Sequence, residues 1–115
     1  MTKAARLAMD TVDAVFKENR LSMGLSHMRS PIDNFYITGA SKRGWTSWSL
    51  ASVDKRVKAV APMVLDCLNM ETLFPQWFQN LGGWSFALGP YYDEDLTKEF
   101  DSPVFAQMAH IIDPY

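Results

Sequence analysis

The sequence predicts an α/β protein, because two short, apolar and β-branched segments flank a serine-containing turn and a helical segment. The first segment is Phe35–Thr38 and the second is Val57–Leu65, and both have the composition of buried strands. A strand, a turn, a helix and a strand within about 30 residues form a βαβ unit with parallel strands. We therefore expect a piece of parallel sheet at the centre of the chain.

Two helices are predicted around this sheet. From Thr2 to Asn19 apolar residues recur at helical spacing, which predicts an amphipathic helix that covers part of one sheet face. Its apolar face contains Ala5, Ala8, Met9, Val12, Val15 and Phe16, and its polar back contains Lys3, Asp10, Asp13 and Lys17. The segment Gly44–Val53 predicts the helix between the strands. Pro62 cannot donate to a ladder, so we expect an irregular or edge-like segment there.

The second half of the chain predicts helices. Glu71–Leu81 is apolar on both sides, with Pro75 as an interruption, and Gly82-Gly83 breaks the chain. Ser102 followed by Pro103 is typical of a helix start, and Asp113-Pro114 of a helix end. We expect one partial domain over residues 1–115, with a piece of sheet core in 1–66 and a mostly helical, lid-like part in 67–115.

Composition argues against several classes of function. The net charge of −2 and the absence of a run of like charges argue against nucleic-acid binding. No apolar stretch is long enough to predict a membrane span, and the N-terminus does not resemble a signal peptide. Two distant histidines and one cysteine predict neither a metal site nor an internal disulfide. No cofactor is expected.

The turn between the first strand and the helix reads Gly39-Ala40-Ser41-Lys42-Arg43-Gly44. A nucleophilic serine must stand clear of the carboxyl end of a strand, and a tight, strained strand-to-helix turn achieves this. Gly39 and Ala40 are small enough to let strand and helix pass closely. The backbone N–H of Lys42, directly after the serine, is placed to donate to an oxyanion.

The turn departs from the usual pattern of such elbows, which is G-x-S-x-G. Arg43 stands where the second glycine is expected, and Gly44 follows one position later. An alternative interpretation is an ordinary turn in which Ser41 caps the helix and catalyses nothing. Lys42 and Arg43 either contact an anionic group or are solvated residues that pair with a nearby aspartate, and the sequence leaves both open.

The stretch Tyr36–Trp48 around this turn resembles the signature of the PhoPQ-activated pathogenicity-related protein family, which includes secreted autocrine proliferation repressor proteins of amoebae. The resemblance continues through Val53–Val60, Pro62–Val64, Leu68–Met70, Gly82–Leu88 and Ile111–Tyr115. It implies an α/β-hydrolase core with Ser41 as nucleophile, a small-molecule or peptide ester or amide as substrate, and an extracellular location. The elbow alone also resembles that of glucuronoyl esterases.

The same resemblance implies that the chain is a fragment of a longer protein. In α/β-hydrolases the serine is followed by an acid and then a histidine, so both are expected beyond Tyr115. His27 precedes the first strand and His110 lies on the last predicted helix, and we expect neither to be catalytic. This chain by itself is therefore expected to be inactive. The alternative function is a non-enzymatic, secreted signalling or binding protein on the same scaffold.

Three further residues are candidates either for the site or for a structural position. Asp66 follows the second strand, at the sheet edge where sites are built, and is a candidate substrate-contacting or orienting residue, or else a turn carboxylate. Trp84 is a candidate pocket wall, with a core position as the alternative. Cys67 is expected to be a small buried hydrophobe, because no histidine stands near it to activate a thiolate.

Overall fold

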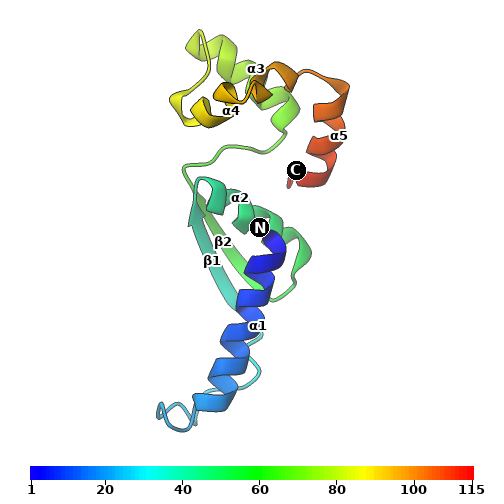
Figure 1. The fold of residues 1–115 in the computed structure, drawn as a ribbon. Coiled ribbons are helices and arrows are strands. Elements are labelled where there is room, and N and C mark those ends of the chain that lie inside the picture. The colour runs from blue at the N-terminus through cyan, green and yellow to red at the C-terminus, as the bar shows by residue number, and fades with distance from the viewer. The chain divides into compact units, whose positions relative to one another are not determined.

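A helix, a strand, a second helix and a second strand follow one another in the first half of the computed structural model, which describes all residues 1–115. They are α1 (Thr2–Asn19), β1 (Phe35–Ala40), α2 (Lys42–Val53) and β2 (Val57–Met63), within a unit that spans Met1–Leu65 (Figure 1). A second unit, Asp66–Tyr115, is helical. It contains α3 (Met70–Leu81), η1 (Phe86–Leu88), α4 (Gly89–Asp93), η2 (Leu96–Glu99) and α5 (Pro103–Ile112).

The two strands form a parallel two-stranded sheet, as the βαβ pattern predicts. Of the two alternatives predicted at Pro62, the irregular segment is wrong, because Pro62 pairs in register with Gly39 and the register shift lies at the start of β1. The edge-like position is confirmed, because β2 pairs with β1 alone. The carbonyl of the next residue, Met63, faces β1, where it accepts from Ser41. Neighbouring residues of a strand point their backbone groups to opposite sides, so the missing N–H of Pro62 faces the free edge and no ladder bond is lost.

The helix boundaries agree with the sequence at most ends. The predicted helix Thr2–Asn19 is confirmed, and so is the start of α5, where the Ser102 hydroxyl accepts from the backbone N–H of Phe105 at 3.1 Å. Two predictions are wrong. The middle helix begins at Lys42 instead of Gly44, because the turn occupies a single residue. Pro75 does not interrupt α3, which loses one hydrogen bond there and continues to Leu81.

The first unit buries one face of its sheet and leaves the other open. Helix α1 packs against α2. The most buried apolar side chains of the unit are Met9 and Phe16 on α1 and Leu50 on α2. On the open face Tyr36 is 79% exposed and Met63 is 50% exposed. The helices of the first unit therefore cover only part of its sheet. None of the helices has both the length and the apolar composition needed to cross a membrane.

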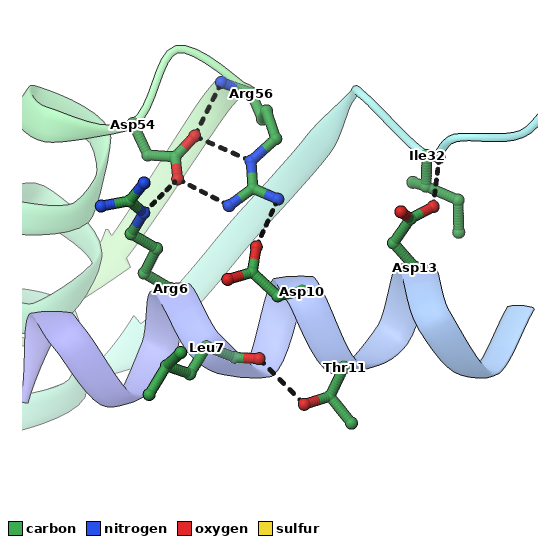
Figure 2. Close-up of polar contacts among 8 residues, drawn as sticks. All are labelled: Arg6, Leu7, Asp10, Thr11, Asp13, Ile32, Asp54 and Arg56. Atoms are coloured by element: carbon green, nitrogen blue, oxygen red, sulfur yellow. Dashed lines mark hydrogen bonds and ion pairs between the residues drawn. The ribbon is translucent and has the colours of Figure 1, made fainter.

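A charge cluster joins α1 to the connection between α2 and β2 (Figure 2). The buried carboxylate of Asp54 accepts from Nε and Nη2 of Arg56 at 3.0 and 2.8 Å, and from its backbone N–H at 3.0 Å. Arg56 also donates to Asp10 at 2.7 Å, and Arg6 lies 3.6 Å from Asp54. The hydrogen bonds from Arg56, side chain first, lower the pKa of Asp54 to about 2. The cluster fixes α1 where α2 ends.

The predicted polar back of α1 is therefore not a fully solvated face. Asp10 is engaged by Arg56, and the carboxylate of Asp13 accepts from the backbone N–H of Ile32 at 2.7 Å (Figure 2). Conversely, Val12 and Val15, predicted for the apolar face, are each about half exposed. Two carboxylates thus attach α1 to other segments, Asp13 to the connection before β1 and Asp10 to the connection before β2. Apolar periodicity does not reveal such contacts.

The second unit is held by aromatic side chains and by one capping carboxylate. Trp84 packs edge-on against Phe100, with ring centroids 5.3 Å apart, and against Phe78 at 4.9 Å. The Asp113 carboxylate accepts from the backbone N–H groups of Asn69 and Met70, at 3.2 and 2.6 Å. These are unsatisfied donors at the start of α3, so Asp113 caps a helix that is distant in sequence. It also accepts from the backbone N–H of Tyr115 in the turn after α5, which is the role that its sequence position predicts.

Candidate active site

Ser41 forms the turn between β1 and α2, and its backbone is in a conformation that non-glycine residues rarely adopt. Its φ is 52° and its ψ is −123°. Such conformations carry strain of about 1–3 kcal/mol and persist only where the surrounding structure enforces them. A strained serine directly after a strand and before a helix is the geometry that lifts a hydroxyl clear of a sheet.

Two glycines make the turn sterically feasible. A Cβ placed on Gly39 would lie 2.6 Å from the carbonyl oxygen of Arg43, inside contact distance with rigid backbone. A Cβ placed on Gly44 would lie 3.0 Å from the Gly39 oxygen and 3.2 Å from the Met63 oxygen. The strand and helix therefore approach each other through bare backbone at both positions. Gly44 makes the close approach even though it is one residue later than in the usual elbow.

The Ser41 side chain does not behave as a helix cap. An N-cap serine has an extended backbone and accepts a hydrogen bond from the first helical turn. Ser41 has a positive φ, and its side chain makes no capping hydrogen bond. The residue is exposed. The capping part of that interpretation is therefore wrong, since the hydroxyl is left free for another partner, and a catalytic role of Ser41 stays a prediction.

The first turn of α2 places donors and positive charge beside the serine. The helix N–H groups there are unsatisfied within the helix, and the helix dipole adds partial positive charge. Lys42 and Arg43 are both exposed, and neither forms an ion pair within the unit. Since cations at a helix amino end are disfavoured by about 0.3–1 kcal/mol each, this turn concentrates positive charge at a cost in stability.

Hydroxyl groups engage the carbonyls of the same turn. Thr46 Oγ1 donates to the carbonyl oxygen of Lys42 at 3.0 Å, and the buried Ser47 Oγ donates to that of Arg43 at 2.9 Å. Bonds of this kind polarise the peptide groups that carry those carbonyls. The turn after Ser41 is thus held by side chains of the following turn as well as by the helix itself.

A second strained residue lies at the same sheet edge. Val64 directly follows β2 and has a φ of 46°, although it is β-branched and 83% exposed. β-branched residues are genuine outliers in this region. Sequence reasoning missed Val64, because a valine in an apolar run predicts a regular strand and carries no signal for a positive φ.

The first unit does not bring His27 to Ser41, and His110 belongs to the second unit. His27 lies in the connection that enters β1 at Phe35, and the six residues of β1, about 20 Å of strand, separate that end from Ser41. His110 lies exposed on α5 of the second unit, beside a hollow lined by Asn69, Glu71 and Asp113. The Asp113 oxygens there already accept backbone N–H groups.

The remaining candidates lie in the second unit. Asp66 is exposed and begins that unit, and Trp84 belongs to its aromatic cluster, so the roles proposed for them at a substrate stay predictions. Cys67 is 3% exposed, and burial, followed by the charges of Asp113 and Asp66, raises the pKa of its thiol to about 11. A thiol in this state is unreactive. No group of histidine, cysteine and carboxylate side chains is placed to hold a metal ion.

Comparison with known proteins relates the whole chain to one family. Residues 1–115 match the PhoPQ-activated pathogenicity-related protein family. The chain is 37% identical over 115 residues to autocrine proliferation repressor protein A of Dictyostelium discoideum. The match covers the entire chain but only 22% of that relative, so the chain spans about a fifth of its length. No solved structure matches the chain.

Proposed function

Because the chain belongs to the PhoPQ-activated pathogenicity-related protein family, we propose that it is the nucleophile-bearing part of a serine hydrolase with an α/β-hydrolase fold. The observation that carries the proposal is the strained, exposed and uncapped Ser41 between a parallel strand and a helix. A turn that exists only for packing gains nothing from a strained serine, since glycine adopts this backbone freely. A nucleophile needs the hydroxyl at that position.

The proposed reaction is hydrolysis of an ester or amide. Ser41 Oγ attacks the carbonyl carbon while its proton passes to a histidine supplied by the rest of the protein. The backbone N–H of Lys42 donates to the oxyanion that forms. The alcohol or amine then leaves with that proton, and water, activated by the same histidine, releases the acyl group from Ser41 as a carboxylic acid.

Neither His27 nor His110 is assigned the role of the base. We propose that the acid and the histidine come from other parts of the full-length protein, because the chain spans only about a fifth of its relative. The isolated 115-residue chain is then inactive towards esters. Turnover of a simple aryl ester by the isolated chain, lost in Ser41→Ala, would refute this assignment.

The experiment for the full-length protein is hydrolysis of para-nitrophenyl hexanoate. We expect turnover that falls at least about a thousandfold in Ser41→Ala, as for removal of a serine nucleophile in general. Ser52→Ala is the matched control, since Ser52 is an exposed serine on α2, the helix that follows Ser41, and its hydroxyl only donates back to the carbonyl of Ser49. Equal activity of wild type and Ser41→Ala would exclude Ser41 as the nucleophile.

A second candidate function is suggested by the name of the relative. That protein is called an autocrine proliferation repressor, so the alternative proposal is a secreted signalling protein in which this scaffold binds a partner and catalyses nothing. One variant, Ser41→Ala, distinguishes the two proposals. Full-length Ser41→Ala retains any repression of proliferation if the protein acts by binding alone, and loses it if repression requires hydrolysis.

A further inference from the structure

We propose that Lys42 and Arg43 select a substrate whose acyl group carries a negative charge, such as an ester of a dicarboxylic acid. The proposal rests on the proposed function, in which Ser41 is the nucleophile. Lys42 and Arg43 are the two residues after Ser41, and both are exposed. A substrate bound at the Ser41 hydroxyl therefore lies within the field of two positive charges, on a chain whose net charge is −2.

No carboxylate of the first unit neutralises these two cations. Asp54 is held by Arg56 and Arg6, and Asp10 by Arg56. Asp13 accepts from the backbone N–H of Ile32. Asp33 accepts from the side-chain amide of Asn34, and Glu18 forms no ion pair. The ion pairs of the unit engage Arg6 and Arg56, whereas Lys42 and Arg43, like other surface cations such as Lys55, form none and are available to an external anion.

The side chain of Arg43 begins beside the strand that leads into Ser41. A Cβ added at Gly39, two residues before Ser41, would lie 2.8 Å from the Cβ of Arg43. In the usual elbow a glycine occupies this position and offers no side chain. A guanidinium binds a carboxylate through two parallel hydrogen bonds. An arginine here therefore supplies a side chain that a standard elbow lacks, and the proposal assigns to it the contact with the substrate carboxylate.

The test compares two esters of equal chain length in the full-length protein. Mono-para-nitrophenyl adipate differs from para-nitrophenyl hexanoate only in carrying a carboxylate in place of the terminal methyl group. We expect kcat/KM to favour the adipate ester at least about tenfold at low salt, and the preference to shrink as salt screens the charges. Arg43→Gln lowers the preference at least about fivefold, Lys42→Gln lowers it as well, and Arg43→Lys retains most of it.

Lys55→Gln is the matched control, because it removes an exposed, unpaired positive charge just beyond the far end of α2 and leaves the preference unchanged. An uncharged fluorophosphonate probe reports in each variant whether Ser41 is still reactive. If it labels Ser41 while wild type shows no preference, or while Arg43→Gln and Lys42→Gln leave the preference intact, the charge proposal is overturned and the nucleophile stands. Absence of both labelling and turnover in wild type overturns the two proposals together.

Discussion

The backbone N–H of Ser41 donates a 2.9 Å hydrogen bond to the carbonyl oxygen of Met63. The ladder between β1 and β2 thus extends onto the serine itself, one residue beyond the last residue of β1. This bond holds the backbone of Ser41 against the sheet while its φ of 52° turns the chain into α2. The strain at Ser41 is therefore maintained by sheet pairing on one side and by the helix on the other.

Adding a methyl group at Gly39 tests the close approach of strand and helix. We expect Gly39→Ala to lower the free energy of unfolding by about 1–3 kcal/mol, because the new Cβ meets the Arg43 backbone, which cannot move aside without distorting α2. Urea unfolding measures the change. Gly83→Ala is the control and should be nearly neutral, since no heavy atom lies within 4 Å of a Cβ there. Equal effects of the two substitutions would contradict the account.

The strain at Ser41 predicts an unusual order of stability. Ser41→Gly should exceed Ser41→Ala in free energy of unfolding by about 1–2 kcal/mol. Glycine releases the backbone strain, and the entropy that glycine loses on folding offsets part of this gain. At Ser52, which lies inside α2, the order should reverse, so that Ser52→Ala exceeds Ser52→Gly in free energy of unfolding by about 1 kcal/mol. The pair of comparisons uses the same urea unfolding measurement. Alanine favoured at both positions would mean that Ser41 is not strained.

The charge cluster of Asp54 predicts a dependence of stability on acid. Hydrogen bonds from Arg56 lower the pKa of Asp54 from 3.8 to about 2 in the folded state. A depressed pKa stabilises the fold above the unfolded value, and that contribution is lost as the pH falls from about 4 to 2. In thermal unfolding, the Tm of wild type should exceed that of Asp54→Asn by a constant amount above about pH 5, and this difference should disappear towards pH 2. Glu18→Gln, which removes an exposed carboxylate with no ion pair, should show no such difference.

The buried Cys67 predicts slow thiol chemistry. Burial, with the charges of Asp113 and Asp66, raises its pKa to about 11, so roughly one thiol in a thousand is ionised at pH 8. We expect reaction with a disulfide reagent at pH 8 to accelerate more than about 100-fold when urea unfolds the chain. Rapid, stoichiometric reaction of the native protein would show that Cys67 is accessible.

The sequence was sufficient to predict the βαβ unit, because periodicity, β-branching and glycine placement act locally. The helix Thr2–Asn19 and the Ser102 cap are confirmed for the same reason. The roles of Asp10 and Asp113 were not predictable, since each depends on a partner distant in the chain. The positive φ of Val64 was not predictable either, because the composition of its apolar, β-branched segment indicates a regular strand. The hydrolase fold and the identity of the catalytic base stay predictions.

The most direct test of the central claim is the site of fluorophosphonate labelling in the full-length protein, located by mass spectrometry of its peptides. We predict a single adduct on the peptide that contains Ser41, absent from Ser41→Ala and retained in Ser52→Ala. Labelling elsewhere, or no labelling of a folded full-length protein, would contradict the assignment of Ser41 as a catalytic nucleophile and favour the signalling alternative.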